Sequence, residues 1–304
     1  MPVAEPPAAA PAPAASTASP SVLAPYRPAV IARLRAAGCV FAEDEARLLL
    51  AAAGTRGELD ALVERRVAGL PLEQVVGWAE FCGLRIAVDP GVFVPRRRTE
   101  FLVRRAVAHV RASPAAPARR PVVVDLCCGS GAVGAAVRAA LGPGIALYAA
   151  DVDPAAVRCA RRNVAAVGGR VYAGDLFDPL PAALRGRVDV LTANVPYVPT
   201  GAVGLLPAEA REHEPRVALD GGADGLDVLR RVAAGAREWL APGGCVLVET
   251  SEGQAAPAAL AFLRGGLTAR LTTSGELDVT VVLGTVAAAG RAAGDGDGDG
   301  VGAG

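Results

Sequence analysis

Apolar residues recur at helical spacing in the first part of this 304-residue chain. Within residues 22–73 they fall, for example, at Val30 and Leu34 and again at Leu49 and Leu50. Glycines interrupt the pattern every few turns. The spacing therefore predicts a small N-terminal domain built of several short helices.

The hydrophobic period changes in residues 74–95, where apolar runs become short and glycines separate them. These runs include Val75-Val76 and the alternating positions Leu84 and Ile86. A Pro-Gly turn sequence follows them. The pattern predicts a linker that contains a β-hairpin of two strands.

From about residue 96 to residue 286, short apolar runs alternate with longer amphipathic stretches. The predicted strands are 122–124, 145–149, 171–173, 188–191, 245–248 and 279–283, and the predicted helices are 101–107, 132–140, 154–167, 226–240 and 255–263. Such alternation is typical of parallel βαβ units, in which ligands bind at the carboxyl ends of the strands. We therefore expect an α/β domain whose functional residues follow its strands.

Composition narrows the classes of function and location. The 31 basic and 31 acidic residues cancel, which argues against nucleic acid as the partner. The six cysteines form no Cys-x-x-Cys pair, so we expect neither a zinc site nor a disulfide framework. No apolar stretch is long enough to predict a membrane span, and no signal peptide is recognisable. We expect a cytoplasmic protein with low-complexity, disordered tails at 1–21 and 287–304.

A glycine-rich turn follows the first strand of the α/β domain and enters a helix. It comprises Asp125, Cys127, Cys128, Gly129, Ser130 and Gly131. Glycines let the backbone approach a ligand, and the free amides at a helix start can bond it. The segment 129–134 also fits the dinucleotide pattern G-x-G-x-x-G, so an NAD enzyme is one hypothesis. The acidic Asp125 before the turn favours S-adenosyl-L-methionine, because it could lie near the methionine ammonium.

Acidic residues after the next two strands extend this predicted cofactor site. Asp151 lies at the end of its strand, where it is expected to accept from ribose hydroxyl groups, whereas Asp153 is expected to cap the following helix. Asp175 is placed to meet the adenine edge, with Leu176 against the ring. A loop-capping role for Asp175 is the alternative.

The segment Asn194-Val195-Pro196-Tyr197 follows the strand at 188–191. An Asn side chain offers a carbonyl acceptor, and the backbone carbonyl before a proline offers a second one, which together suit a planar NH2 group. The Tyr197 ring could then lie beside the plane of the bound NH2 group. An ordinary turn after a strand is the other interpretation of these residues.

Together these motifs make the chain resemble the protein-(glutamine-N5) methyltransferases of the HemK/PrmC type, which modify the Gly-Gly-Gln loop of peptide-chain release factors. Segments 42–50, 71–77 and 94–100 resemble that family's N-terminal domain, hairpin entry and Pro-Arg-Pro-x-Thr-Glu segment, and 214–222 matches the stretch after its Asn-Pro-Pro-Tyr signature. The resemblance implies a Rossmann-like class I methyltransferase sheet, S-adenosyl-L-methionine as cofactor and a protein as substrate. It also implies that Asn194 contacts both cofactor and acceptor, and that residues 22–73 recognise the substrate.

The chain departs from that family's pattern at two places. Val195 stands where the first proline is expected, and Arg97-Arg98 replace a Pro-x pair. Val195 keeps its carbonyl and still precedes Pro196, which favours extended backbone. The run Arg96–Arg98 has two interpretations, a solvated surface patch or a site for an acidic partner.

Three other functions compete with amide methylation. An N6-adenine nucleic-acid methyltransferase could use the same Asn-x-Pro-Tyr logic on a flipped base. In a non-catalytic binding module, Val195 would mark the decay of a former active site. The intact cofactor loop argues against this hypothesis. An NAD dehydrogenase would leave the Asn-x-Pro-Tyr element without a role.

Overall fold

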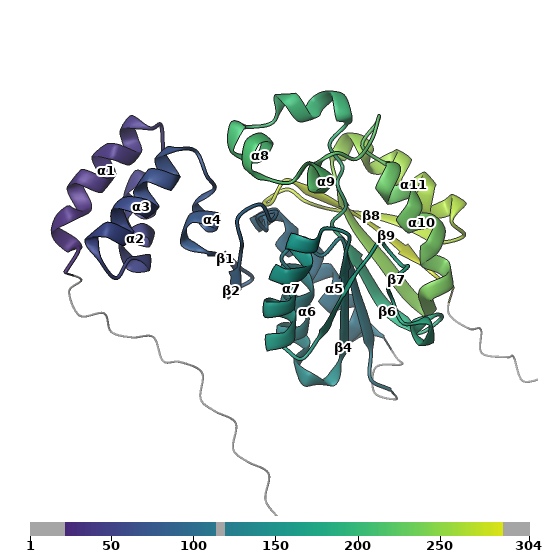
Figure 1. Ribbon diagram of the computed structural model, residues 1–304. Coiled ribbons are helices and arrows are strands. Elements are labelled where there is room, and N and C mark those ends of the chain that lie inside the picture. Colours follow the sequence, from purple (N-terminus) through teal and green to yellow (C-terminus); the bar gives the residue numbers. More distant parts are fainter. Residues whose placement is uncertain (1–21, 114–118, 288–304) are drawn as a thin grey trace, which may run out of the picture. The chain divides into compact units, whose positions relative to one another are not determined.

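The computed structural model describes residues 22–113 and 119–287, so almost all of the two predicted tails lies outside the described residues. The chain divides into two compact units, Met1–Val76 and Gly77–Gly304 (Figure 1). The boundary lies three residues beyond the one expected from sequence. As a result, the hairpin belongs to the second unit.

The first unit is helical, as its apolar spacing predicts. It contains η1 (Ala24–Tyr26), α1 (Arg27–Ala36), α2 (Ala42–Ala52), α3 (Arg56–Val67) and α4 (Leu72–Val76). Val30, Leu34 and Leu49 are buried in its core. The strand expected at Val75-Val76 is wrong, because both residues lie in α4, where Val75 packs into this core.

The predicted hairpin is present but shorter. Strand β1 (Trp78–Phe81) pairs antiparallel with β2 (Leu84–Ala87). Phe81 and Ile86 are buried against the helices of the second unit. Alternation of buried and exposed residues in β1 and β2 thus seats the hairpin on the larger domain.

The second unit is built on a seven-stranded sheet of order β5-β4-β3-β6-β7-β9-β8. Its strands are β3 (Val122–Leu126), β4 (Ala146–Asp151), β5 (Arg170–Ala173), β6 (Val188–Ala193), β7 (Leu240–Thr250), β8 (Thr268–Ser274) and β9 (Val279–Thr285). The five strands from β5 to β7 are parallel, which confirms the expected βαβ alternation. The expectation of parallel pairing is wrong for the last predicted strand, because β9 runs antiparallel to both β7 and β8. Strand β8 escapes prediction because it is a Thr-rich, largely exposed edge strand.

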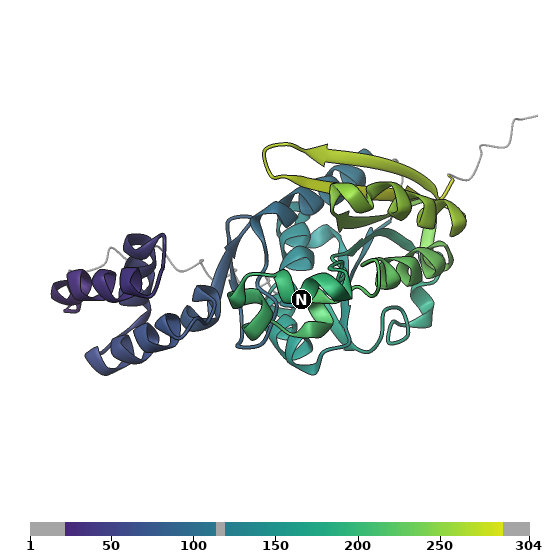
Figure 2. The same ribbon diagram turned by 90° about the horizontal axis from the view of Figure 1, so that it is seen from above.

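Helices cover both faces of this sheet, as the two views in Figures 1 and 2 show. They are α5 (Glu100–Ala112), α6 (Ala132–Leu141), α7 (Pro154–Ala166), α8 (Ala208–His213), α9 (Arg216–Leu219), α10 (Asp227–Trp239) and α11 (Ala255–Arg264). One core layer joins α5, α6 and α7 to the sheet, and the other joins α10 and α11 to its opposite face. The short connections also contain η2 (Arg97–Thr99), η3 (Gly142–Gly144), η4 (Ala182–Leu184), η5 (Thr200–Leu205) and η6 (Glu252–Gln254).

The strand register brings the predicted functional segments to one edge of the sheet. Leu126 of β3 pairs with Ala193 of β6, and Ala193 pairs with Val248 of β7. The residues that follow them therefore lie side by side at the carboxyl edge. This is the edge at which open α/β sheets bind ligands.

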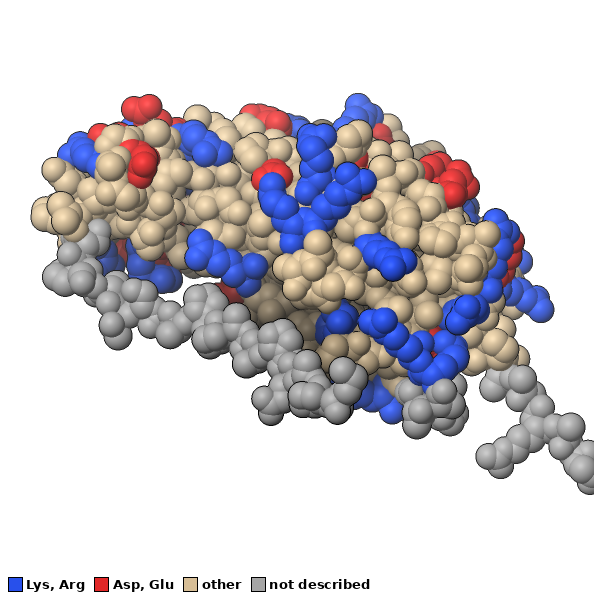
Figure 3. Space-filling view, turned by 60° about the horizontal axis from the view of Figure 1, so that its bottom comes forward, with Lys and Arg blue, Asp and Glu red and all other residues tan. Residues whose placement is uncertain are grey.

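Surface charge is distributed unevenly although the net charge is zero. On the face in Figure 3, arginine side chains form several groups and fewer acidic side chains are visible. In the described part of the chain, no helix is both long and apolar enough to cross a membrane. Residues 22–113 and 119–287 also hold no cluster of His, Cys, Asp and Glu suited to a metal ion.

Candidate active site

The glycine-rich turn after β3 has the conformation that its sequence predicts. Cys127, Gly129 and Gly131 have φ values of +51°, +54° and +78°, in the left-handed region that favours glycine. A Cβ on Gly129 would meet nothing within 4 Å, whereas one on Gly131 would lie 2.8 Å from Val164 of α7. The first glycine thus leaves space for a ligand, and the second allows α7 to pack closely.

The start of helix α6 directly follows this turn. Gly131 has no side chain to cap α6, and Asp125 accepts from the amide of Gly134, the third residue of the helix, so the amides of Ala132 and Val133 remain for a ligand. The neighbouring Cys128 amide donates to the Ala150 carbonyl (3.1 Å), and the Ser130 carbonyl accepts from Asn163 (2.8 Å). The turn is therefore held by its own neighbours before any ligand binds.

Asp151 at the end of β4 organises the turn. Its Oδ2 accepts from the Gly129 amide (2.8 Å), and its Oδ1 accepts from the Asp153 amide (2.9 Å). Burial raises the pKa of this carboxyl. Each oxygen keeps a second lone pair, so the expected bond to a ribose hydroxyl fits the geometry. Asp153 caps α7 by accepting from Ala155 (2.8 Å), which confirms that prediction.

Asp125 is the most deeply buried acid of the predicted cofactor site. Its Oδ2 accepts from the Gly134 amide (2.9 Å) and its Oδ1 from the Thr192 hydroxyl (2.9 Å). Burial raises the pKa of the Asp125 carboxyl to about 7. The side chain therefore ties β3 to α6 and β6, and its expected approach to a methionine ammonium stays a prediction.

Asp175 and Leu176 lie in the loop after β5. The Asp175 carboxylate forms an exposed ion pair with Arg231 (2.6 Å). Leu176 has a φ of +47° and is buried in the core layer under α10. The Leu176 side chain is thus already packed, and its contact with an adenine ring stays a prediction.

The segment Asn194-Val195-Pro196-Tyr197 leaves β6 beside this turn. Asn194 Oδ1 is buried and accepts no hydrogen bond in the described structure. The neighbouring Val195 carbonyl also accepts none from the described residues. A buried oxygen without a partner is costly, so these two acceptors fit a ligand that brings N–H donors.

A glycine-rich turn at 221–225 contacts the backbone at the end of this segment. Val198 donates to the Leu219 carbonyl (3.0 Å), and Gly221 donates to the Val198 carbonyl (2.8 Å). A Cβ on Gly225 would lie 2.2 Å from the Tyr197 carbonyl oxygen, so only glycine allows this approach. The turn therefore supports the backbone directly after Val195, which stands where proline is expected.

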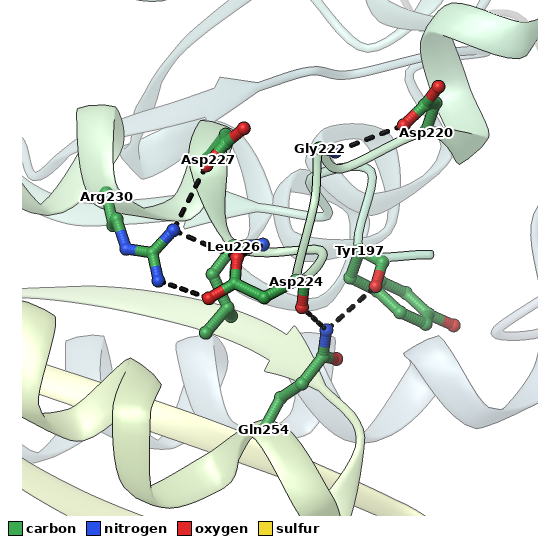
Figure 4. A network of polar contacts seen from close by, with 8 residues as sticks. All are labelled: Tyr197, Asp220, Gly222, Asp224, Leu226, Asp227, Arg230 and Gln254. Atoms are coloured by element: carbon green, nitrogen blue, oxygen red, sulfur yellow. Dashed lines mark hydrogen bonds and ion pairs between the residues drawn. The ribbon is translucent and has the colours of Figure 1, made fainter. Parts of the chain in front are cut away.

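Gln254 joins the two segments, as Figure 4 shows. Its amide donates to the carbonyls of Tyr197 and Asp224, both at 2.9 Å. In the same network, Arg230 pairs with Asp224 and Asp227. Sequence reasoning missed this role of Gln254, since a lone glutamine in a helical turn gives no signal.

The arginine run lies against the acceptor segment. Arg96 pairs with the buried Glu214 (2.5 Å), and Arg98 pairs with the buried Glu249 (2.9 Å). Arg98 also donates to the Tyr197 hydroxyl. Arg96 and Arg98 thus pair within the chain with side chains that stay 36% and 44% exposed, and the two interpretations of the run stay predictions.

Glu249 is a site residue that sequence reasoning missed. It directly follows Val248, which pairs with Ala193, and its side chain is 2% exposed. Its Oε2 is buried without a hydrogen-bond partner. A single acid that ends the apolar run 245–248 was the available signal.

The comparisons with known proteins agree with this geometry. Residues 84–206 match the family model "Methyltransferase small domain". The chain is 41% identical over 207 residues to the release factor glutamine methyltransferase of Geobacter sulfurreducens, covering 67% of this chain and 69% of that protein. It is 36% identical over 247 residues to the enzyme of that name from Bradyrhizobium diazoefficiens, covering 75% and 82%.

Two further matches show the breadth of the fold. A 4-amino-L-phenylalanine/4-methylamino-L-phenylalanine methyltransferase of Streptomyces pristinaespiralis is 39% identical over 204 residues, covering 67% of this chain and 69% of that protein. The hMettl16 catalytic domain, solved with an RNA hairpin, has a TM-score of 0.51 at 14% identity over 74% of this chain and 81% of that chain. The second match shows the fold alone. The two release factor enzymes, each matched over more than two thirds of its length, lead to one conclusion: the chain belongs to the release factor glutamine methyltransferase family.

Proposed function

We propose that this enzyme methylates the side-chain amide nitrogen of a protein glutamine, in the Gly-Gly-Gln loop of a peptide-chain release factor. The observation that carries the proposal is the pair of unfilled acceptors at Asn194 and Val195. The relatives with that printed name support the choice of substrate. Because release factors act during translation, we place the enzyme in the cytoplasm.

S-adenosyl-L-methionine is the methyl donor, and when bound it supplies an electrophilic methyl group on a sulfonium. The residues that fit it are the Gly129 turn, the first two amides of α6 and the Asp151 carboxylate. Asp125, Asp175 and Leu176 complete this proposed site. All of them come from β3, β4 and β5, next to the acceptor segment on β6.

The chain's own residues address the main chemical difficulty. An amide nitrogen is a poor nucleophile because its lone pair is delocalised into the carbonyl. Asn194 Oδ1 and the Val195 carbonyl accept the two N–H groups and so aim the nitrogen. Catalysis by such positioning works because the site is fixed before the substrate enters.

Tyr197 provides a wall for the bound amide plane. Its hydroxyl accepts from Arg98, and its carbonyl accepts from Gln254, so both ends of the residue are fixed. Burial raises the pKa of the Tyr197 phenol, which keeps the ring neutral at neutral pH. A neutral ring packs on a neutral amide without an electrostatic penalty.

The first unit is proposed to recognise the protein substrate. Val40 and Phe41 are adjacent in the described structure and are 83% and 70% exposed. Exposed neighbouring apolar side chains are common at protein contacts. Phe41→Ala should raise the KM for a release factor and leave the affinity for S-adenosylhomocysteine unchanged; an unchanged KM would remove Phe41 from the contact.

An aromatic amine is the second candidate acceptor. The observation that favours it is the relative from Streptomyces pristinaespiralis, which is nearly as similar as the release factor enzymes. A planar aryl NH2 group offers the same two donors as a primary amide. The N6-adenine alternative has only the general Asn-x-Pro-Tyr logic in its support.

One transfer assay separates these candidates. Tritiated S-adenosylmethionine is supplied with a release factor, its Gly-Gly-Gln variant carrying Gln→Ala, 4-amino-L-phenylalanine, or unmethylated DNA. Label on the wild-type factor and none on its variant is the expected result. Label only on the aromatic amine or only on DNA would overturn the glutamine assignment.

A further inference from the structure

Three segments linked by Arg98 each hold a buried polar atom without a partner. In the described part of the chain six such side-chain atoms occur, and three of them are Thr99 Oγ1, Asn194 Oδ1 and Glu249 Oε2. Arg98, which precedes Thr99, bonds Glu249 and the Tyr197 hydroxyl. Arg98 therefore connects the segment before α5 and the end of β7 to the acceptor segment.

The strand register places Glu249 next to the start of the acceptor segment. Thr192 pairs with both Asp125 and Leu247, and its hydroxyl bonds the Asp125 carboxylate, so these side chains share one face. Side chains two residues apart in a strand point the same way, so Glu249 continues that face in β7. Ala193, the last residue of β6, pairs with Val248, so Asn194 and Glu249 directly follow a pair of neighbouring residues.

The two oxygens of Glu249 are used differently. Oε1 accepts from Arg98 Nε at 2.9 Å, which fixes the carboxylate on the side of the arginine segment. Oε2 is buried and has no partner in the described structure. A buried carboxylate oxygen without a donor is unfavourable, so its retention points to a donor that arrives with the substrate.

We propose that Glu249 is a catalytic residue whose Oε2 shares, as the second acceptor of a bifurcated hydrogen bond, the N–H that Asn194 Oδ1 accepts, and then takes its proton. The inference rests on the proposed function and adds a general base to it. The nitrogen forms a bond to the methyl carbon while the carbon–sulfur bond breaks and leaves its electron pair on sulfur. The nitrogen then loses one proton to Glu249, which passes it to solvent.

The ion pair with Arg98 is compatible with this role. An N-methylated amide that still carries the extra proton is far more acidic than a carboxylic acid. The transfer to Glu249 is therefore downhill even beside a guanidinium group. Arg98 donates both to Oε1 of Glu249 and to the Tyr197 hydroxyl. It therefore positions the Glu249 carboxylate relative to the Tyr197 ring.

A purely structural role for Glu249 makes different predictions. A residue that only neutralises Arg98 would affect the melting temperature and the affinity for S-adenosylhomocysteine. A base would affect kcat, while folding and cofactor affinity stay close to those of the wild type. Measuring all three quantities on one set of variants distinguishes the roles.

The test compares Glu249→Gln and Glu249→Asp with Glu252→Gln as the matched control. The glutamine variant retains the shape but offers an N–H donor, and the aspartate variant retains the charge but withdraws the carboxylate. The control makes the same change on an exposed residue three positions away. We expect kcat to fall about 10²-fold or more for Glu249→Gln, the range for loss of a general base. Glu249→Asp should also lose activity, and the control should match the wild type.

Two outcomes separate this inference from the proposed function. Wild-type kcat in Glu249→Gln on an acceptor that the enzyme methylates would overturn the base and leave the function standing. If the wild type labels no release factor, the function fails, and the variants are compared on 4-amino-L-phenylalanine. Calorimetry of a Gly-Gly-Gln peptide with the S-adenosylhomocysteine complex gives a readout without turnover. A wild type that neither methylates nor binds these acceptors overturns both proposals.

Discussion

The cofactor turn and the acceptor segment lie on adjacent strands yet differ in how their polar groups are satisfied. At the turn, Asp125 and Asp151 each bond two groups of the protein. At the acceptor segment, Asn194 and Glu249 each keep a buried oxygen without a partner in the described structure. The polar groups of the turn are bonded within the protein, whereas under the proposed function those of the acceptor segment are bonded by the substrate.

This difference teaches where each kind of mutation should act. Changes at the turn remove bonds that already exist, so they should affect folding and cofactor affinity. Changes at the acceptor segment remove bonds that form only with the substrate, so they should affect turnover. Mutations can therefore separate the two regions.

Asn194→Ala should produce the largest effect. Losing one of two directional acceptors should lower the transfer rate by about 10²-fold or more, because the amide is no longer aimed. Affinity for S-adenosylhomocysteine, measured by calorimetry, should stay close to that of the wild type. Turnover equal to the wild type would refute the positioning mechanism for any acceptor.

Asp151→Ala should act on the cofactor turn. It removes the acceptor of the Gly129 amide and of the expected ribose hydroxyl, which should cost about 1 to 3 kcal/mol of S-adenosylmethionine binding. Asp153→Ala is the control, since it removes only a helix cap. Equal cofactor affinities in the two variants would take Asp151 out of the binding site.

Asp125→Asn should change how stability depends on pH. Burial raises the pKa of this carboxyl from 3.8 to about 7 in the folded chain. Between these values the folded chain holds a proton that the unfolded chain has lost, so Asp125 makes stability fall as pH rises. The variant should lack this contribution. Urea unfolding of both chains from pH 4 to 8, without cofactor, measures it, and parallel pH curves would contradict the predicted role.

Val195→Pro should have the smallest effect. The change keeps the carbonyl, and the Val195 amide donates no hydrogen bond to the described residues. Turnover should be equal to the wild type or mildly raised, because proline stiffens the backbone. A loss of more than tenfold in the transfer assay would show that the segment needs the conformation that valine permits.

Much of the fold could be predicted from periodicity because the inner strands are mainly apolar. Strands β3 and β6 are buried at every position, so their runs stand out from the amphipathic helices. Strand β8 could not be recognised, because most of its side chains are exposed and it holds no buried apolar run. The antiparallel direction of β9 is a long-range property that no local pattern contains.

The site was predictable to the extent that its residues form short motifs. The Gly129 turn and Asn194 segment are continuous in sequence, and their residues do meet at one edge. Glu249, Arg98 and Gln254 belong to the same site but come from distant segments. Their contacts depend on the register of β6 with β7 and on the path of the segment before α5, which sequence spacing does not encode.

The outer turn at 221–225 has a consequence for how such enzymes can be recognised. This turn contacts the backbone at residues 196–198, so its support does not depend on which side chain stands at position 195. A search pattern that demands two consecutive prolines would reject this chain. A pattern that pairs Asn-x-Pro-Tyr with a downstream Gly-Gly-x-x-Gly turn would retain it, and would gather enzymes by their shared support rather than by one residue.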